Sequence, residues 1–493
     1  MGQYRFTVPE CDRLTEDSLV SSQIIGLEGT PWAGKTVLQN GMLYVTRNNS
    51  VSGRLLVPWK IQGFGELAVA TGTLPESDHP YCLILELARG SLSRLRNQLS
   101  LWFEGGLQIG APIHKRIDRL VESFSEALFS IETKQETIDR CENVIDGCIT
   151  LMFELTNEFS RQLAAFQSSQ DDSVPVIAGS VVDVTTDRPI PPLVDDMAIE
   201  KMAQPALANS THDGEDLDFA TTTRIVDWIN SPAKHAVKII GPILPLDNPN
   251  LPDWLSNQST FEERVNACKK ACRQLGDQFS NELKILHVTS GISGVGHQHF
   301  NYPQQLQLTL EMLESLEQKM PNQAMMVSFD QPWGERLSMA TGGTPAVEAA
   351  DSLIRHGARL SALGLEFNLD YWPHGSLMRD PLQWVDLIDR WSQFGLPLVI
   401  YLCAPTGSIN ESPNNRFLQT IRGGAQSPKF NEYLATIIRL LTHRPAVNVI
   451  AWRRVFDDDN PRFPFSGLVE AGGNLKPIAN DFADYIRDTE PES

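Results

Sequence analysis

The chain has 493 residues, of which 41% are hydrophobic and 21% charged, a composition ordinary for globular proteins. A chain of this length is too long for one compact core, so we expect two or three domains. The formal net charge of −20 argues against a broad phosphate-binding surface, and therefore against nucleic acid as a partner. No apolar run approaches the roughly 18–20 residues that span a bilayer, so the sequence predicts no membrane segment.

The cysteines and the N-terminus bear on location and metal binding. The N-terminus lacks a positive segment followed by an apolar run, so no secretory signal is predicted. The 7 cysteines are scattered, without two pairs at zinc-ligand spacing. We therefore expect reduced thiols and a cytoplasmic protein. His297 and His299 lack a convincing third ligand, and we predict neither a metal nor a cofactor.

Residues 1–105 have the pattern of a small antiparallel β-sandwich, with short apolar or alternating runs at 53–59, 65–74 and 81–88. Residues 106–170 change to apolar spacing at i, i+3, i+4 and i+7, which predicts two amphipathic helices in an antiparallel hairpin. We expect this hairpin to connect two domains, and a partner-binding coiled coil is the alternative.

Residues 174–485 alternate apolar strand-like runs with helical stretches, which predicts a parallel sheet buried on both faces. Seven strands are visible and an eighth is expected within 186–220, so we predict an α/β fold of the (β/α)₈ TIM-barrel type. An open doubly wound sheet is the competing fold, but its glycine-rich turn is missing. Residues 486–493 form a tail. The seven runs are 175–184, 236–246, 283–291, 324–335, 360–372, 396–405 and 447–456.

Three segments resemble the family-10 glycoside hydrolases, the xylanase family, in the same order along the chain. Residues 237–255 are similar to the third barrel strand of that family, and residues 447–478 resemble its eighth strand and the turn leading into its last helix. The runs LGLEFNLDYW and LPLVIYLCAP stand where its sixth and seventh strands would fall. The resemblance implies a barrel whose mouth binds an oligosaccharide or polysaccharide. Its most specific part has these residues in register: Trp452, Asp457, Gly467, Leu468, Gly473, Lys476 and Pro477.

The two catalytic glutamates of that family have no counterpart in this chain. In the family, one follows an asparagine at the end of strand four and the other ends strand seven. Thr289, Ser290 and Gly291 stand at the first place here, and Cys403 and Ala404 at the second. Retaining hydrolysis needs two carboxyl groups about 5–5.5 Å apart, and inversion about 6.5–9.5 Å. We therefore expect the catalytic carboxylates to be lost or relocated.

The ends of the fifth and sixth strands hold the candidates for a relocated site, because barrel chemistry lies at the carboxyl ends of strands. The catalytic candidates are Glu366 with Asp330 or Glu335. Glu366 either faces the barrel interior or forms a structural ion pair with Arg359 or Arg379, and Glu335 otherwise caps the following helix. Aromatic and amide side chains that suit sugar rings and hydroxyls are the substrate-binding candidates: Gln331, Trp333, Asn368, Tyr371, Trp372, Trp452 and Trp254.

The sequence therefore predicts a carbohydrate-active protein that binds a sugar at the barrel mouth. The alternatives are an active O-glycoside hydrolase using the strand-five and strand-six carboxylates, and a purely structural barrel. Sandwich modules beside glycosidases often bind sugar, so Trp32, Trp59 and Trp102 either stack on a sugar ring or fill the core. Catalytic activity, the glycan and the oligomeric state stay open at this point.

Overall fold

The structure is a computed structural model, and no helix in the part of the chain that it describes is long and apolar enough to cross a membrane. The described residues are 2–129, 134–168, 176–183, 188–202, 206–207, 217–218, 228, 238–248, 250–279, 284–296, 298–339, 343–406, 421–457 and 462–487.

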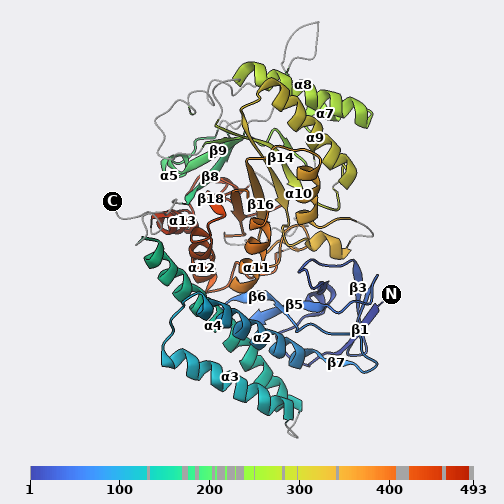
Figure 1. Cartoon of the computed structure of the whole chain (residues 1–493), viewed down its shortest axis with the longest axis vertical. Coiled ribbons are helices and arrows are strands. Elements are labelled where there is room, and N and C mark those ends of the chain that lie inside the picture. Colours follow the sequence, from blue (N-terminus) through green and yellow to red (C-terminus); the bar gives the residue numbers. More distant parts are fainter. Residues whose placement is uncertain are drawn as a thin grey trace.

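The N-terminal part contains two small sheets, at the bottom right of Figure 1. The first holds β3 (Gly34–Gln39), β4 (Met42–Arg47), β1 (Gly2–Thr7) and β7 (Tyr81–Cys82), in that order. The second holds β2 (Gln23–Ile25), β5 (Arg54–Ile61) and β6 (Gly65–Ala70), and the short helix α1 (Glu16–Val20) lies between β1 and β2 in the chain. The runs at 53–59 and 65–74 are thus strands, as predicted.

The strand prediction for residues 81–88 is wrong beyond its first two residues. Only Tyr81–Cys82 pair with β1, and helix α2 (Leu83–Glu104) begins directly after them. Leu87, Leu95 and their helical neighbours are buried on one side of α2. A short continuous apolar run is compatible with a buried helix as well as with a strand, so its periodicity over eight residues was not decisive.

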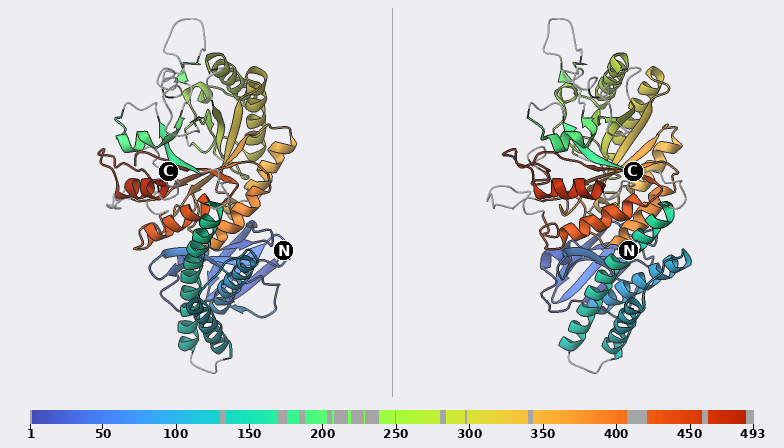
Figure 2. Two further views of the ribbon diagram at one scale, coloured as in Figure 1. Left: turned by 60° about the vertical axis from the view of Figure 1, so that its left-hand side comes forward. Right: turned by 90° about the vertical axis from the view of Figure 1, so that its left-hand side faces the viewer.

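Two further helices follow α2 and form an antiparallel pair, α3 (Ala111–Phe129) and α4 (Lys134–Ser168). Helix α4 contacts α2 and α3 on one side and the barrel helices α11 (Pro381–Ser392) and α12 (Phe430–Thr442) on the other. Figure 2 shows α4 running from the N-terminal sheets to the barrel. Aromatic stacking joins α2 to α4, with the rings of Trp102 and Phe159 4.6 Å apart.

The C-terminal part is a closed parallel barrel of eight strand positions, which confirms the predicted fold. Each strand pairs in parallel with the next, and β18 pairs with β8 to close the circle. Strand β9 is the one expected within 186–220. The positions are β8 (Ile177–Asp183), β9 (Ala198–Met202), β12 (Ile239–Ile240) with β13 (Leu244–Pro245), β14 (Ile285–Ile292), β15 (Ala324–Asp330), β16 (Ala362–Asn368), β17 (Leu398–Cys403) and β18 (Val447–Trp452).

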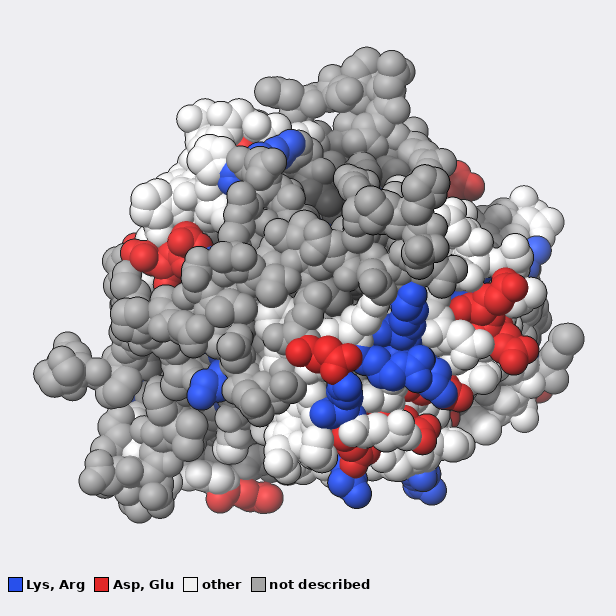
Figure 3. Space-filling view, turned by 90° about the horizontal axis from the view of Figure 1, so that it is seen from above, with Lys and Arg blue, Asp and Glu red and all other residues white. Residues whose placement is uncertain are grey.

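Helices cover the outside of this barrel (Figure 1). Besides α11 and α12 they are α5 (Pro192–Asp196), α7 (Asp253–Ser256), α8 (Phe261–Phe279), α9 (Tyr302–Lys319), the 3₁₀ helix η1 (Glu335–Met339), α10 (Ala346–Arg355) and α13 (Pro477–Arg487). A separate strand pair joins β10 (Ala206–Leu207) to β11 (Leu217–Asp218). Acidic and basic side chains lie beside one another on the described part of the end seen in Figure 3.

The interior of the barrel changes from apolar to polar along the strands. Side chains alternate between the two faces of a strand, so Ala362 and Glu366 share the interior face while Leu365 faces the helices. Near the amino ends the interior is apolar, with Met326 and Val399 among its residues. Towards the carboxyl ends the interior positions are polar, and the candidate site is built there.

The N-terminal domain docks on the loop between β16 and α11. The backbone N–H of Ala68 in β6 donates to the carbonyl of Met378 at 2.8 Å, and Gln383 returns a bond to the carbonyl of Ala68 at 2.7 Å. Arg94 of α2 forms two hydrogen bonds with the carboxylate of Asp380, at 2.8 and 3.0 Å. This domain therefore lies against the barrel where β16 ends.

Candidate functional site

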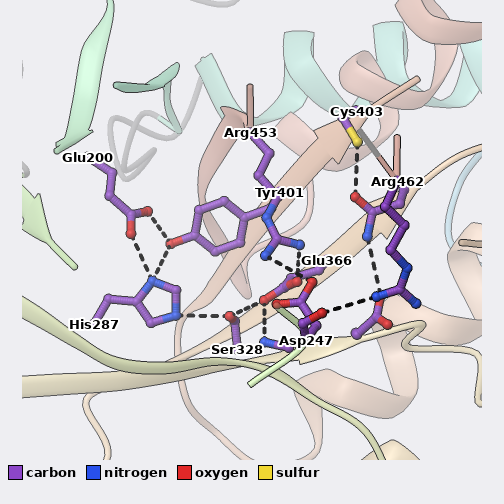
Figure 4. A network of polar contacts seen from close by, with 12 residues as sticks. Glu200, Asp247, His287, Ser328, Glu366, Tyr401, Cys403, Arg453 and Arg462 are labelled. Atoms are coloured by element: carbon purple, nitrogen blue, oxygen red, sulfur yellow. Dashed lines mark hydrogen bonds and ion pairs between the residues drawn. The ribbon is translucent and has the colours of Figure 1, made fainter. Parts of the chain in front are cut away.

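Glu366 lies on the interior face of its strand with 1% of its surface exposed; the sequence alone had left open which face it takes. One carboxylate oxygen accepts hydrogen bonds from the backbone N–H of Gly291, at 2.8 Å, and from the hydroxyl of Ser328. The other oxygen pairs with Arg453, which follows β18. Arg453 also lies 3.9 Å from Asp247 (Figure 4). Both oxygens of Glu366 are therefore engaged by the protein itself.

The ion-pair partner of Glu366 differs from both predicted alternatives. Arg359 is an exposed residue that pairs with Glu317 at 2.6 Å, and the buried Arg379 pairs with Glu335 at 3.2 Å. Arg453 reaches Glu366 because only β17 separates β18 from β16 in the sheet, so the two strands end close together. Arg453 was not among the candidates, although it lies within the predicted strand run 447–456.

A hydrogen-bonded chain continues from Glu366 towards the middle of the barrel. The Nε2 atom of His287 lies 2.9 Å from the Ser328 hydroxyl, and Nδ1 lies 2.8 Å from Glu200. The phenol of Tyr401 donates to the other oxygen of Glu200. Ser328 has one hydrogen, which it donates to Glu366, so Nε2 of His287 must donate to Ser328. The chain joins β9, β14, β15, β16 and β17 in one network (Figure 4).

Asp330 stands one strand away from Glu366 and is also neutralised. It is 1% exposed, and its carboxylate pairs with Arg336 at 2.8 Å. Its second oxygen accepts from the side-chain amide of Asn368 at 3.2 Å, and the amide oxygen of Asn368 lies 3.0 Å from the thiol sulfur of Cys403. Asp330 and Asn368 are thus brought together, as their neighbouring strands predict.

Burial and arginine pairing set the electrostatics of these carboxyl groups. Burial raises the pKa of Glu366, while Arg453 opposes that rise and Asp247 adds to it. Burial likewise raises the pKa of Glu335, and Arg379 opposes it. Glu335 begins η1 and is 0% exposed, so it is a buried ion-pair residue. Each predicted catalytic carboxyl therefore has an arginine beside it.

Most predicted sugar-stacking residues lie in the core. Trp452 is 0% exposed on the outer face of its strand, and its indole N–H donates to the carbonyl of Ser466 at 2.9 Å. Trp333 packs edge-on against Phe367 and Trp384, with ring centroids 5.0 and 4.9 Å apart. Neither ring offers a free face at the mouth.

Most of the remaining substrate-binding candidates are also buried or bonded within the protein. Tyr371 is fully buried and its hydroxyl donates to the carbonyl of Pro464 at 2.6 Å. The amide of Gln331 donates to the carbonyls of Pro373 and Gly375, at 2.9 and 2.7 Å, and so holds the loop after β16. Three more of the tryptophans considered for sugar stacking lie in the core, with these exposed fractions: Trp254 4%, Trp59 0% and Trp102 5%.

Trp372 is also largely buried, at 8% exposed, but it lines a cavity of about 540 Å³ between the N-terminal domain and the barrel. Trp32 forms another part of the wall, with its indole N–H donating to Glu28 at 3.0 Å. Gln23 is 2% exposed and lines the same cavity, and neither its amide nitrogen nor its amide oxygen has a hydrogen-bond partner. The other lining residues are Asp17, Val20, Ser21, Ser22, Ile24, Gly34, Lys35, Thr36, Val45, Ser338, Met339, Pro373 and Arg422.

The position of this cavity relates it to the barrel mouth. Ser338 and Met339 lie beyond the carboxyl end of β15, and Trp372 lies beyond that of β16. The barrel side of the cavity is therefore part of the catalytic rim that TIM-barrel enzymes use. Its other side comes from α1 and β2 to β4, which the sequence did not connect with the rim.

Within the described residues, no group of three or more His, Cys, Asp and Glu side chains is placed to hold a metal ion. His297, the first histidine of the pair with His299, lies outside those residues, as do residues 488–493 of the predicted tail.

Comparison with known proteins gives structural similarity without sequence similarity. No protein-family model matches the chain, and no curated protein matches it significantly. Xylanase 10B of Thermotoga maritima has 14% identity and a TM-score of 0.44, over 66% of this chain and 98% of that one. Xylanase 10B of Thermotoga petrophila RKU-1, solved with xylobiose, has 15% identity and a TM-score of 0.45, over 67% and 98%. Xylanase B of Clostridium stercorarium F9 has 13% identity and a TM-score of 0.42, over 64% of this chain and 98% of that one.

The similarity to these solved xylanases is one of structure, at 13–15% identity. Fold similarity at this level does not carry chemistry from one protein to another. Function therefore rests on the residues of this chain alone.

Proposed function

We propose that this protein binds an oligosaccharide at the rim of its barrel without hydrolysing it. The observation that supports binding is the cavity between the N-terminal domain and the barrel, with Trp32, Trp372 and the unpartnered amide of Gln23 in its wall. Sugar sites combine aromatic surface, on which the ring stacks, with a few polar groups that bond its hydroxyls. This wall has both.

Gln23 favours a hydroxyl-bearing ligand over an ion. Its amide offers one donor group and one acceptor, and both are buried and unpaired. A buried polar group without a partner costs about 1–3 kcal/mol, so a native protein rarely keeps one without a use. A sugar hydroxyl donates and accepts at once, and two neighbouring hydroxyls match the amide on both sides.

The carboxyl groups support the second half of the proposal, that no bond is broken. A glycosidase needs one carboxyl group that gives a proton and another that faces the sugar or a water. Glu366, Asp330 and Glu335 are each held by an arginine, and Glu366 uses both oxygens in bonds to the protein. Hydrolysis at these residues would require breaking such pairs in the barrel interior.

The test measures binding and hydrolysis on the same preparations. Titration calorimetry with xylohexaose, cellohexaose and a panel of soluble plant and bacterial polysaccharides should find at least one ligand for the full chain. Gln23→Leu and Trp32→Ala should each weaken that ligand at least tenfold. Gln98→Leu, at a half-buried position of α2 outside the cavity, should bind like the wild type.

The hydrolysis arm uses reducing-sugar release over long incubation, with Glu366→Gln beside the wild type. We expect no release from any substrate. Release that disappears in Glu366→Gln would instead establish a glycosidase with relocated carboxylates. Failure of the whole panel to bind, or binding that both cavity variants leave unchanged, would reject the proposed site.

A further inference from the structure

A second, smaller cavity lies between the same two parts of the chain and has a different chemistry. Its volume is about 30 Å³. Two of its arginines, Arg54 of β5 and Arg94 of α2, come from the N-terminal part, and two, Arg379 and Arg390, come from the start and end of the α11 region. Asp386 is the one acidic residue among the residues of the wall. Four guanidinium groups therefore surround a space much too small for a sugar.

Two of the four arginines already have partners. Arg94 binds the buried carboxylate of Asp380 through two hydrogen bonds, at 2.8 and 3.0 Å. Arg379 pairs with Glu335 at 3.2 Å. These pairs hold the cavity wall in place, and that of Arg94 with Asp380 is bidentate.

The other two arginines are not paired in the same way. Within the described residues, neither Arg54 nor Arg390 has an acidic oxygen within 4.0 Å. The guanidinium of Arg390 lies directly against the backbone of Gly29, where a Cβ atom would collide with it. Burial and the nearby positive charge of Arg94 lower the pKa of Arg54, while the negative charges of Asp386 and Asp380 oppose that fall. Arginine stays charged regardless, so the wall holds four positive charges, and Asp386 is its own acidic side chain.

Unfilled hydrogen-bond donors add to this charge. The indole N–H of Trp333 and the Nε–H of Arg379 are buried and have no partner, and both residues line the cavity. The Arg379 guanidinium carbon lies 4.8 Å from the centre of the Trp333 ring, so the two donors stand close together. A site that offers donors and positive charge selects a ligand made of acceptors.

We propose that this cavity binds a small oxyanion, phosphate or sulfate, which joins the N-terminal domain to the barrel. A cavity needs about 10–15 Å³ of such volume to hold one water, so this one has room for roughly two waters, or for two of the oxygens of an oxyanion. Tetrahedral oxyanions match guanidinium donors in geometry and accept at every oxygen. Because its ligands come from both parts of the chain, the bound ion stabilises their docking.

The experiment uses the full chain in a chloride buffer. Sodium phosphate and sodium sulfate should raise the Tm by several degrees with saturation in the millimolar range, and sodium chloride at matched ionic strength should not. Arg54→Gln and Arg390→Gln should each weaken phosphate at least tenfold, as measured by calorimetry. Arg96→Gln removes the same charge from an exposed position on α2 and should bind phosphate like the wild type.

Further arms identify the ion's source and guard against unfolded variants. Inorganic phosphate and glycerol phosphate are compared: Arg54-dependent binding of either supports the oxyanion site, and tighter glycerol phosphate marks the ion as the head of a larger ligand. Tungstate soaked into wild-type crystals should give anomalous density beside Arg54 and Arg390. An equal Tm rise with chloride, unchanged affinity in both arginine variants, or tungstate density elsewhere only would overturn the proposal. Because these variants lie outside the sugar cavity, the two proposals fail or stand separately.

Discussion

Replacing Arg453 tests whether the Glu366 pair is a structural element of the barrel. In Arg453→Met, the Glu366 carboxylate, 1% exposed, keeps only the bonds from Gly291 and Ser328. Removing one member of a buried ion pair leaves an uncompensated charge and costs about 3–5 kcal/mol. We therefore expect the free energy of unfolding at pH 7 to fall by about that amount.

A double-mutant cycle separates the pair from the rest of the network. Glu366→Gln keeps an oxygen that accepts from the Gly291 N–H, and leaves Arg453 near Asp247 at 3.9 Å, so it should cost less, about 1–3 kcal/mol. The double variant should lose less than the sum of the two single variants, because the charge that Arg453→Met strands is already gone. Urea unfolding followed by circular dichroism measures all three against the wild type.

The pH dependence supplies a second readout with a definite sign. Burial raises the pKa of Glu366 in the folded state, and loss of Arg453 removes the main opposing influence. When the folded protein keeps a proton that the unfolded chain releases, the stability of the fold decreases as the pH rises. The deficit of Arg453→Met should thus be smaller at pH 5 than at pH 8.

The control is Arg359→Met, which removes a pair with Glu317 from a side chain that is 78% exposed. Exposed pairs contribute about 0–1 kcal/mol, so this variant should stay close to the wild type. If Arg453→Met is as stable as Arg359→Met and the cycle shows no coupling, Arg453 does not hold Glu366. The Glu366 carboxylate would then be available for chemistry, and the proposal that the protein binds a sugar without hydrolysing it would lose its support.

Two further changes are predicted from single buried groups. Gln23→Leu removes two unpaired polar atoms from the cavity wall, so the variant without ligand should be about 1–3 kcal/mol more stable than the wild type. It should also bind sugar more weakly. A lower stability in urea would show that the amide of Gln23 already has hydrogen-bond partners. Burial raises the pKa of Asp370 to about 7 from 3.8, a difference of about 3 that corresponds to roughly 4 kcal/mol. This contribution is present below pH 4 and is lost as the pH rises through 7. The stability of the wild type relative to Asp370→Asn should therefore fall over that range. A constant difference between the urea midpoints of the two proteins from pH 4 to 8 would contradict the prediction.

The barrel could be predicted because its evidence is local. Continuously apolar runs such as 396–405 and 447–456 are typical of strands that a parallel barrel buries on both faces. Between these runs, apolar residues recur at the spacing of a helix. The period of two along β16 was also enough to place Glu366 and Asn368 on one face. At residues 81–88 the local pattern suits either structure, and there the prediction failed.

The partners of these residues were decided by the tertiary structure alone. Arg453 reaches Glu366, 87 residues away in the sequence, because only one strand of the barrel separates β16 from β18. The sequence pattern of either strand does not show that proximity. The cavity joins Gln23 and Trp32 to Trp372, from two domains whose docking depends on surface contacts such as Arg94 with Asp380. Sequence patterns report which face of an element is buried, and they do not report what the opposite wall will be. The neutralised interior formed when the strands of the barrel came together, and the two cavities formed where the N-terminal domain packs against the barrel.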